Sequence, residues 1–299
     1  MWLKQTDAAS WSRRDSMGAV VYQDKMWLLG GFTPERLNEV WCSSDGVAWS
    51  RVTEAAPWPK RNLHCALVYD GRMWVFAGGD RPLSYNDVWY STDGKHWTRA
   101  TATAPWTERR AAAAVAYDGK LWLLGGSRWS DLSHYNDVWC STDGARWELV
   151  TADAPWSARS MHTAVVFDRK LWLMGGGQYN PAYPQNTVVN HSDVWYSTDG
   201  ATWHQATGAA AWPARRFHAS TVYDGKLWII AGHHRGNRND VWYSADGKEW
   251  HEAQPQAPWP VRHAPACLVF RDRLWLLGGY GDVLYNDVWS YGAASGDAA

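Results

Sequence analysis

The stretch Asp118–Gly126, DGKLWLLGG, together with Asn136–Trp147, NDVWCSTDGARW, decides the fold, because six versions of it follow one another along the 299-residue chain. Each version holds four short apolar segments separated by Asp-Gly and Gly-Gly dipeptides. Equivalent tryptophans in successive versions are 47 to 56 residues apart. A period of this size with four short segments per unit is typical of propeller blades, whereas helical repeats would show a 3.6-residue periodicity.

The 25 tryptophans follow the same period. They form four sets with one member per repeat, and Trp129 alone has no counterpart. Differences in repeat length fall between the glycine pair and the Asp/Glu-Val-Trp triplet, so the pattern places every insertion in one connection. The repeat therefore accounts for nearly all of the unusual composition and leaves Trp129 to be explained separately.

The third repeat illustrates the strands that we expect in one blade. Apolar residues in it are grouped into four runs, and both Asp-Gly pairs, at 118–119 and 143–144, favour two-residue hairpin turns because these residues tolerate positive φ angles. The predicted strands a to d are residues 112–117, 120–124, 138–142 and 146–150. Strand b is apolar on both sides, which fits a sheet packed between neighbouring blades.

The two ends of the chain predict how the ring closes. The sixth repeat ends after its third strand at Trp289, while the chain begins with an unpartnered fourth strand around Trp2. We therefore expect a single all-β domain over residues 1–292, a six-bladed propeller whose last blade is completed by residues 1–6, followed by a flexible tail at 293–299. Such closure removes exposed sheet edges.

Charge and cysteine content narrow the function classes. With 29 basic and 30 acidic residues the net charge is -1, so bulk electrostatics favours neither nucleic acid nor an anionic membrane surface. The sequence has no apolar run long enough to span a bilayer and no apolar signal core at its start, so we expect a cytoplasmic, monomeric protein. The four cysteines lack the spacing of a metal site, and we expect them to be reduced and the protein to need no cofactor.

The repeat resembles the kelch family over essentially the whole chain. The resemblance rests on Arg-x-x-His, Asp-Gly-Lys-Leu-Trp, Gly-Gly and Asn-Asp-Val-Trp, with departures at Ala231 and at Met17, Ala112 and Pro265, where other repeats have Gly and His. It implies a propeller similar to those of galactose-oxidase-like copper-radical oxidases and sialic acid mutarotases. The family also includes protein-binding modules, so the resemblance does not choose among these functions.

An arginine follows each linker tryptophan by three residues: Arg14, Arg61, Arg109, Arg159, Arg215 and Arg262. Six cations near the axis could attract an anion. The favoured interpretation is structural, because a residue present in all six repeats serves the blade itself. Its expected partners are the acids that end the variable loops: Glu39, Asp87, Asp137, Asp193, Asp240 and Asp287.

The face formed by the b–c loops and the d–a links is the expected site of function, because only this face varies between repeats. An asymmetric ligand needs residues that differ between blades, such as those directly after the arginines: Asp15, Asn62, Arg110, Ser160, Arg216 and His263. With residues of the loops, the predicted ligand-binding set is Arg81, Arg110, Arg128, Trp129, Arg216, His233, His234, His263 and Tyr280. Such groups suit carboxylates and sugar rings, although an ordinary solvated surface fits equally well. The fourth loop, with Tyr179, Pro181, Tyr183 and Pro184, could form a lid or wall.

His64, His162 and His218 occupy equivalent positions, so a metal across the channel is conceivable. The same histidine belongs to the kelch pattern, which favours a structural role, and no residues mark a Tyr/Cys crosslink of an oxidase. We predict no metal site.

Two functions remain open. The first is a recognition module that binds an acidic peptide or small carboxylate on the loop face, and the second is an enzyme acting on a carbohydrate acid, such as a mutarotase or epimerase that uses an arginine and an acid/base pair. Candidate acids are Asp15, Glu35, Asp80, Glu108, Asp131 and Asp282, but no spacing selects a catalytic pair.

Overall fold

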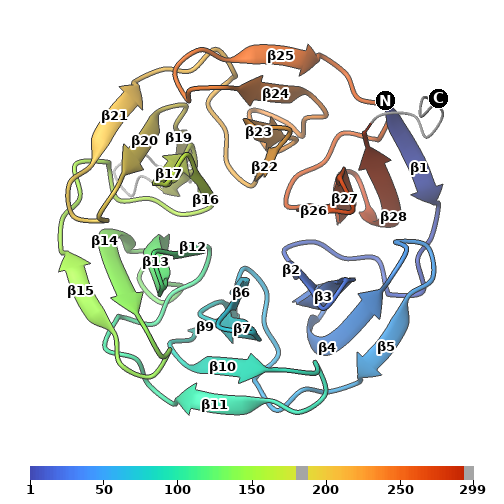
Figure 1. Cartoon of the computed structure of the whole chain (residues 1–299), viewed down its shortest axis with the longest axis horizontal. Helices are drawn as coiled ribbons and strands as arrows, with labels where there is room; N and C mark the ends of the chain where they lie inside the picture. Colours follow the sequence, from blue (N-terminus) through green and yellow to red (C-terminus); the bar gives the residue numbers. More distant parts are fainter. Residues whose placement is uncertain (180–187, 293–299) are drawn as a thin grey trace.

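The computed structural model describes residues 1–179 and 188–292, which form six four-stranded antiparallel sheets around one axis (Figure 1). The first three blades contain β2 (Gly18–Tyr22), β3 (Lys25–Phe32), β4 (Arg36–Ser43) and β5 (Ser50–Thr53); β6 (Cys65–Tyr69), β7 (Arg72–Phe76), β10 (Val88–Ser91) and β11 (Thr98–Thr101); and β12 (Ala113–Tyr117), β13 (Lys120–Ser127), β14 (His134–Ser141) and β15 (Glu148–Thr151). The last three contain β16 (Thr163–Phe167), β17 (Lys170–Met174), β20 (Val194–Ser197) and β21 (His204–Thr207); β22 (Ala219–Tyr223), β23 (Lys226–Ile230), β24 (Val241–Ser244) and β25 (His251–Gln254); and β26 (Ala266–Phe270), β27 (Arg273–Tyr280), β28 (Leu284–Tyr291) and β1 (Trp2–Thr6). The six-bladed propeller is confirmed.

The ring closes as predicted, because the N-terminal strand β1 pairs antiparallel with β28 of the last blade. Trp2 lies opposite Tyr291, and the N-terminal ammonium donates a hydrogen bond to the Gly292 carbonyl at 3.0 Å. The expected flexible tail, residues 293–299, lies outside the described residues.

The two predicted hairpin turns differ in the structure. Asp118 and Gly119 have φ angles of 46° and 65° and form the two-residue a–b turn that was expected. The prediction was wrong for the c–d turn, where strand d begins only at Glu148. There the Asp143 carboxylate accepts hydrogen bonds from the backbone N–H groups of Ala145 and Arg146, both at 2.8 Å. This side-chain capping stabilises a longer loop than the dipeptide alone predicts.

Tryptophans pack each blade internally and against its neighbour. In every blade the linker tryptophan meets the tryptophan at the start of strand d edge to face, with ring centroids 5.8 to 6.1 Å apart. Trp2 and Trp259 make this pair in the closing blade, at 5.8 Å. Between blades, a side chain at Gly144 would clash with Trp74 of the preceding blade at 2.1 Å, so only glycine lets the two blades approach this closely.

The b–c connections differ between blades. In blades one, three and six the central strands extend into the loop, whereas blade two adds the hairpin β8 (Gly79–Asp80) and β9 (Leu83–Ser84), and blade four adds β18 (Gly177–Tyr179) and β19 (Val188–Asn190). The rest of the expected lid in blade four, residues 180–187, lies outside the described residues. Among the described segments, no helix is long and apolar enough to cross a membrane.

Candidate functional site

The six repeated arginines are structural, as predicted, because each one is buried against an acid of its own blade. Five of the ion pairs have N–O distances of 2.5 to 2.7 Å, and Arg14 contacts Glu39 in the sixth. Arg215 shows the pattern: its guanidinium donates to both carboxylate oxygens of Asp240 and to the Ala231 carbonyl. These arginines are no more than 1% exposed, so their charge is already paired and they offer no site to a ligand.

Two residues after each paired arginine, the chain forms a ring of hydrogen bonds around the axis, here called the neck ring. In each blade one residue with a φ of 49° to 59° donates its N–H to the carbonyl of its counterpart in a neighbouring blade, at 2.7 to 3.1 Å. The members are Ser16, Leu63, Ala111, Met161, Phe217 and Ala264. The ring separates the central channel from the layer of side chains on the loop face, which we call the mouth.

The mouth is built by pairing the d–a links with the b–c loops. Isolated β-bridges join Arg110 to Ser127, Arg216 to His233, and His263 to Tyr280. The structure therefore brings these predicted site residues of blades three, five and six to the same layer.

One side of the mouth, here called the arginine side, is cationic. The Arg110 guanidinium lies over the ring of Trp129, 3.2 Å from its centroid, and the Arg81 guanidinium lies 5.4 Å from the centroid of the same ring. Burial lowers the pKa of Arg110 to about 10, the Tyr179 hydroxyl opposes this change, and the charges of Arg36 and Arg81 add to it. Trp129, the tryptophan outside the repeat, thus positions Arg110. The contact with the ring face does not use the guanidinium N–H groups of Arg110 as hydrogen-bond donors.

Arg216 lies at the border of the arginine side. Its guanidinium donates to the Asn190 amide oxygen at 3.1 Å, and burial lowers its pKa while Tyr179 raises it. Within the described residues no carboxylate pairs with Arg110 or Arg216. The sequence of residues 180–187, NPAYPQNT, contains no acid that could do so.

The opposite side, here called the aromatic side, is a wall of rings that contact one another in tilted and edge-on arrangements. His263 lies 5.2 Å from Phe217, 5.3 Å from Tyr280 and 5.9 Å from His233, measured between ring centroids. Its Nδ1 is 2.7 Å from the Asn237 amide oxygen. Burial, with the nearby His233 and Arg216, lowers the pKa of His263 to about 4, so the imidazole is neutral at pH 7.

Asp15 is the buried acid of the mouth. It is 7% exposed, and burial raises its pKa to about 6 against the opposing effects of a hydrogen bond with Ser16 and the charge of Arg36. The other candidate acids are exposed or paired. Glu35 pairs with Lys60, Asp80 with Arg36, and Glu108 and Asp131 both pair with Arg128, while Asp282 is exposed.

Two predicted ligand-binding residues have partners of their own. Arg128 is held by Glu108 and Asp131, which leaves less of its charge for a ligand. The Nδ1 of His234 lies 2.7 Å from the Ala214 carbonyl. Neither residue is brought into the contacts that define the arginine and aromatic sides.

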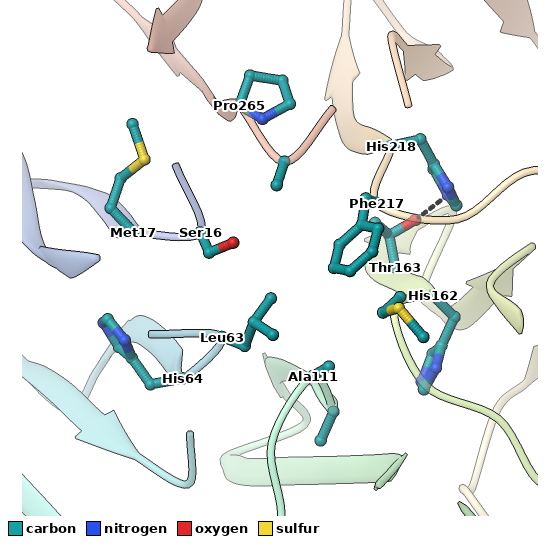
Figure 2. A pocket seen from close by; sticks show the side chains of 13 residues that line it. Ser16, Met17, Leu63, His64, Ala111, His162, Thr163, Phe217, His218 and Pro265 are labelled. Atoms are coloured by element: carbon teal, nitrogen blue, oxygen red, sulfur yellow. Dashed lines mark hydrogen bonds between the residues drawn. The ribbon is translucent and has the colours of Figure 1, made fainter. Parts of the chain in front are cut away.

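Below the neck ring is a cavity of about 210 Å³ lined by ring residues and by His64, His162 and His218 (Figure 2). The histidines do not converge on one point: His162 Nε2 is 3.1 Å from the Leu124 carbonyl of the preceding blade, and His218 Nε2 is 2.9 Å from the Thr163 hydroxyl. Burial lowers the pKa of all three to about 3. Among the residues that the structure describes, no group of three metal-ligating side chains forms.

Three residues of the mouth were not predicted from the sequence: Arg36, Phe217 and Asn190. Arg36 begins strand β4, Phe217 belongs to the neck ring, and Asn190 ends β19. Phe217 could have been found from its position, because each neck-ring residue follows the variable position that the repeat defines.

Six antiparallel blades closed by the N-terminal strand, with an asymmetric mouth above a closed hydrogen-bond ring, define a six-bladed β-propeller domain. The family model of the KLHDC2/KLHL20/DRC7 Kelch-repeats domain matches residues 2–176 and 140–296. The chain therefore belongs to the Kelch-repeat family. Domains of this family typically serve as protein-binding scaffolds. A comparison with curated proteins finds no match.

Proposed function

We propose that the protein is a recognition propeller that binds a carboxylate-bearing segment of a partner protein at the mouth. The observation that carries the proposal is the pair of arginines, Arg110 and Arg216, which are partly or fully buried without a carboxylate partner among the described residues. Burying a cation without a counterion is unfavourable, and a ligand carboxylate that accepts hydrogen bonds from either guanidinium would offset that cost.

The contrast with the six structural arginines supports this assignment. Each of those has an acid within its own blade, whereas the next residue along the chain in blades three and five is an arginine that has none. Trp129 and Asn190 hold the two guanidinium groups in place, which reduces the entropy lost on binding.

The test is a thermal-shift measurement with two probes, glucuronate and a Gly/Ser decapeptide that contains one Asp-Glu pair. We expect the peptide to raise the melting temperature, and the rise to disappear in the Arg110→Ala/Arg216→Ala double variant. Arg146→Ala is the matched control, because Arg146 is exposed on the c–d turn of the other face. A peptide that causes no shift, or a shift that survives in the double variant, would refute the proposal.

The second candidate function is an enzyme acting on a carbohydrate acid, and one observation favours it. With a pKa of about 6, the Asp15 carboxyl exchanges its proton near neutral pH, as a general acid/base must. In this reading an arginine holds the substrate carboxylate. Glucuronate that shifts the melting temperature and undergoes ring opening faster with the protein than with Asp15→Asn would support it. A melting-temperature shift with glucuronate but without faster ring opening would leave ligand binding as the function.

A further inference from the structure

We infer that the segment recognised at the mouth carries a large apolar or aromatic side chain next to its carboxylate, which packs on the aromatic side while the carboxylate lies on the arginine side. This inference rests on the proposed function and specifies the chemistry of the partner.

The aromatic side has the shape of a continuous wall from the axis outward. Phe217 lies at the neck ring and points toward the channel (Figure 2), His263 lies tilted beside it at 5.2 Å, and Tyr280 continues the wall at 5.3 Å from His263. Tyr280 is 38% exposed, so the outer end of the wall is open to a ligand. Flat rings arranged in this way favour contact with an apolar or aromatic side chain.

The wall is also uncharged at neutral pH. His263 is kept neutral by burial, and burial together with Arg216 and His234 lowers the pKa of His233. The wall therefore does not add to the positive charge of the arginine side. The mouth has two chemically different halves, and Arg216 stands where they meet because its charge acts on both His233 and His263.

The rim around the mouth carries apolar side chains between charged ones such as Glu35, Asp131 and Asp282. Large hydrophobic side chains exposed by 38% to 58% stand on its loops and on one link: Leu83, Leu132, Val189, Val261, Tyr280 and Val283. A small sugar acid would cover none of these outer positions, whereas a peptide whose carboxylate lies at the centre would pass over the rim. Apolar positions around a cationic centre complement an acidic segment with flanking apolar residues.

The experiment uses two matched series of fluorescein-labelled Gly/Ser dodecapeptides that share one Asp-Glu pair. In the first series a single Trp stands one to four residues before or after the pair, and in the second Gln replaces that Trp. Fluorescence anisotropy measures the dissociation constants with the full chain and with Arg110→Ala, Tyr280→Ala, Tyr280→Phe and Arg146→Ala.

We expect at least one Trp peptide to bind about tenfold more tightly than its Gln twin. This gain should fall below twofold in Tyr280→Ala and persist in Tyr280→Phe, which keeps the ring, and in Arg146→Ala. Because Tyr280 is exposed, we expect Tyr280→Ala to fold, and its melting curve checks this.

Trp peptides that all bind within twofold of their Gln twins would overturn the inference, as would a gain that survives Tyr280→Ala. In either case, binding of the Gln peptides that is lost in Arg110→Ala would leave the proposed function standing. Failure of every peptide to bind would overturn both.

Discussion

Asp15→Asn should stabilise the propeller at neutral and alkaline pH and have little effect in acid. The folded-state pKa of Asp15 is about 6 and its ordinary value is 3.8, so the folded protein binds this proton more tightly than the unfolded chain does. The carboxyl therefore costs almost nothing below its unfolded pKa, destabilises the fold increasingly as the pH rises from the unfolded to the folded pKa, and has its full effect above the folded pKa. At about 1.4 kcal/mol per pKa unit, the full penalty is about 3 kcal/mol.

Asparagine has nearly the same shape and no charge, so the variant should gain about 3 kcal/mol in the free energy of unfolding at pH 8. The gain should shrink to about 1.5 kcal/mol at pH 5 and below about 1 kcal/mol at pH 4. Urea denaturation followed by tryptophan fluorescence at pH 4, 5, 6, 7 and 8 measures the difference directly.

The quantity to compare is the difference in the free energy of unfolding between Asp15→Asn and the wild-type protein, because other groups titrate in the same pH range. His64, His162 and His218 have folded-state pKa values of about 3, so both proteins lose stability as the pH falls below about 6.5. Asp282→Asn, at an exposed position of the same face, should change stability by less than about 0.5 kcal/mol at any pH. A difference for Asp15→Asn that does not vary with pH, or a wild-type protein that is the more stable at pH 8, would refute the reasoning.

Three further outcomes are expected. Deleting residues 1–6 exposes the edge of β28 and should lower the free energy of unfolding by several kcal/mol, of about the size seen when a large buried ring is removed; an unchanged melting temperature would contradict the closure. Asp240→Ala leaves Arg215 buried without its counterion and should cost about 3 to 5 kcal/mol in urea denaturation, a loss below 1 kcal/mol being inconsistent with the ion pair. Trp129→Ala should release Arg110 and weaken binding of the Asp-Glu decapeptide about tenfold in an anisotropy titration, with Trp129→Phe between it and wild type; equal affinity in all three proteins would show that the stacking does not position the arginine.

The parts of the structure that could be predicted from the sequence are those that the repeat determines. Trp2 was assigned to the last blade because its set of tryptophans lacked a sixth member, and the ion pairs were predicted because arginine and acid recur together. Periodicity works here because six copies of one pattern must satisfy the same packing and hydrogen-bonding needs.

The candidate site was predicted less completely because its residues lie in loops that differ between the six repeats. The loops of the mouth have different lengths, so no register relates Arg36 to Arg110 or Trp129 to Arg81 before the chain is folded. The c–d turn was mistaken for a different reason, since the Asp143 side chain competes with the backbone for the N–H groups that would close a tighter hairpin.

The neck ring has an electrostatic consequence. All six N–H groups point to the carbonyl of a neighbouring blade in the same rotational sense, from Ser16 to Ala264, on through Phe217, and finally back to Ser16. Peptide dipoles that circulate head to tail around an axis cancel, so the ring adds almost no field along the channel, unlike a helix end, where aligned dipoles sum. The neck ring itself thus gives an ion no preference for entering the channel, and the arginines of the mouth favour an anion there.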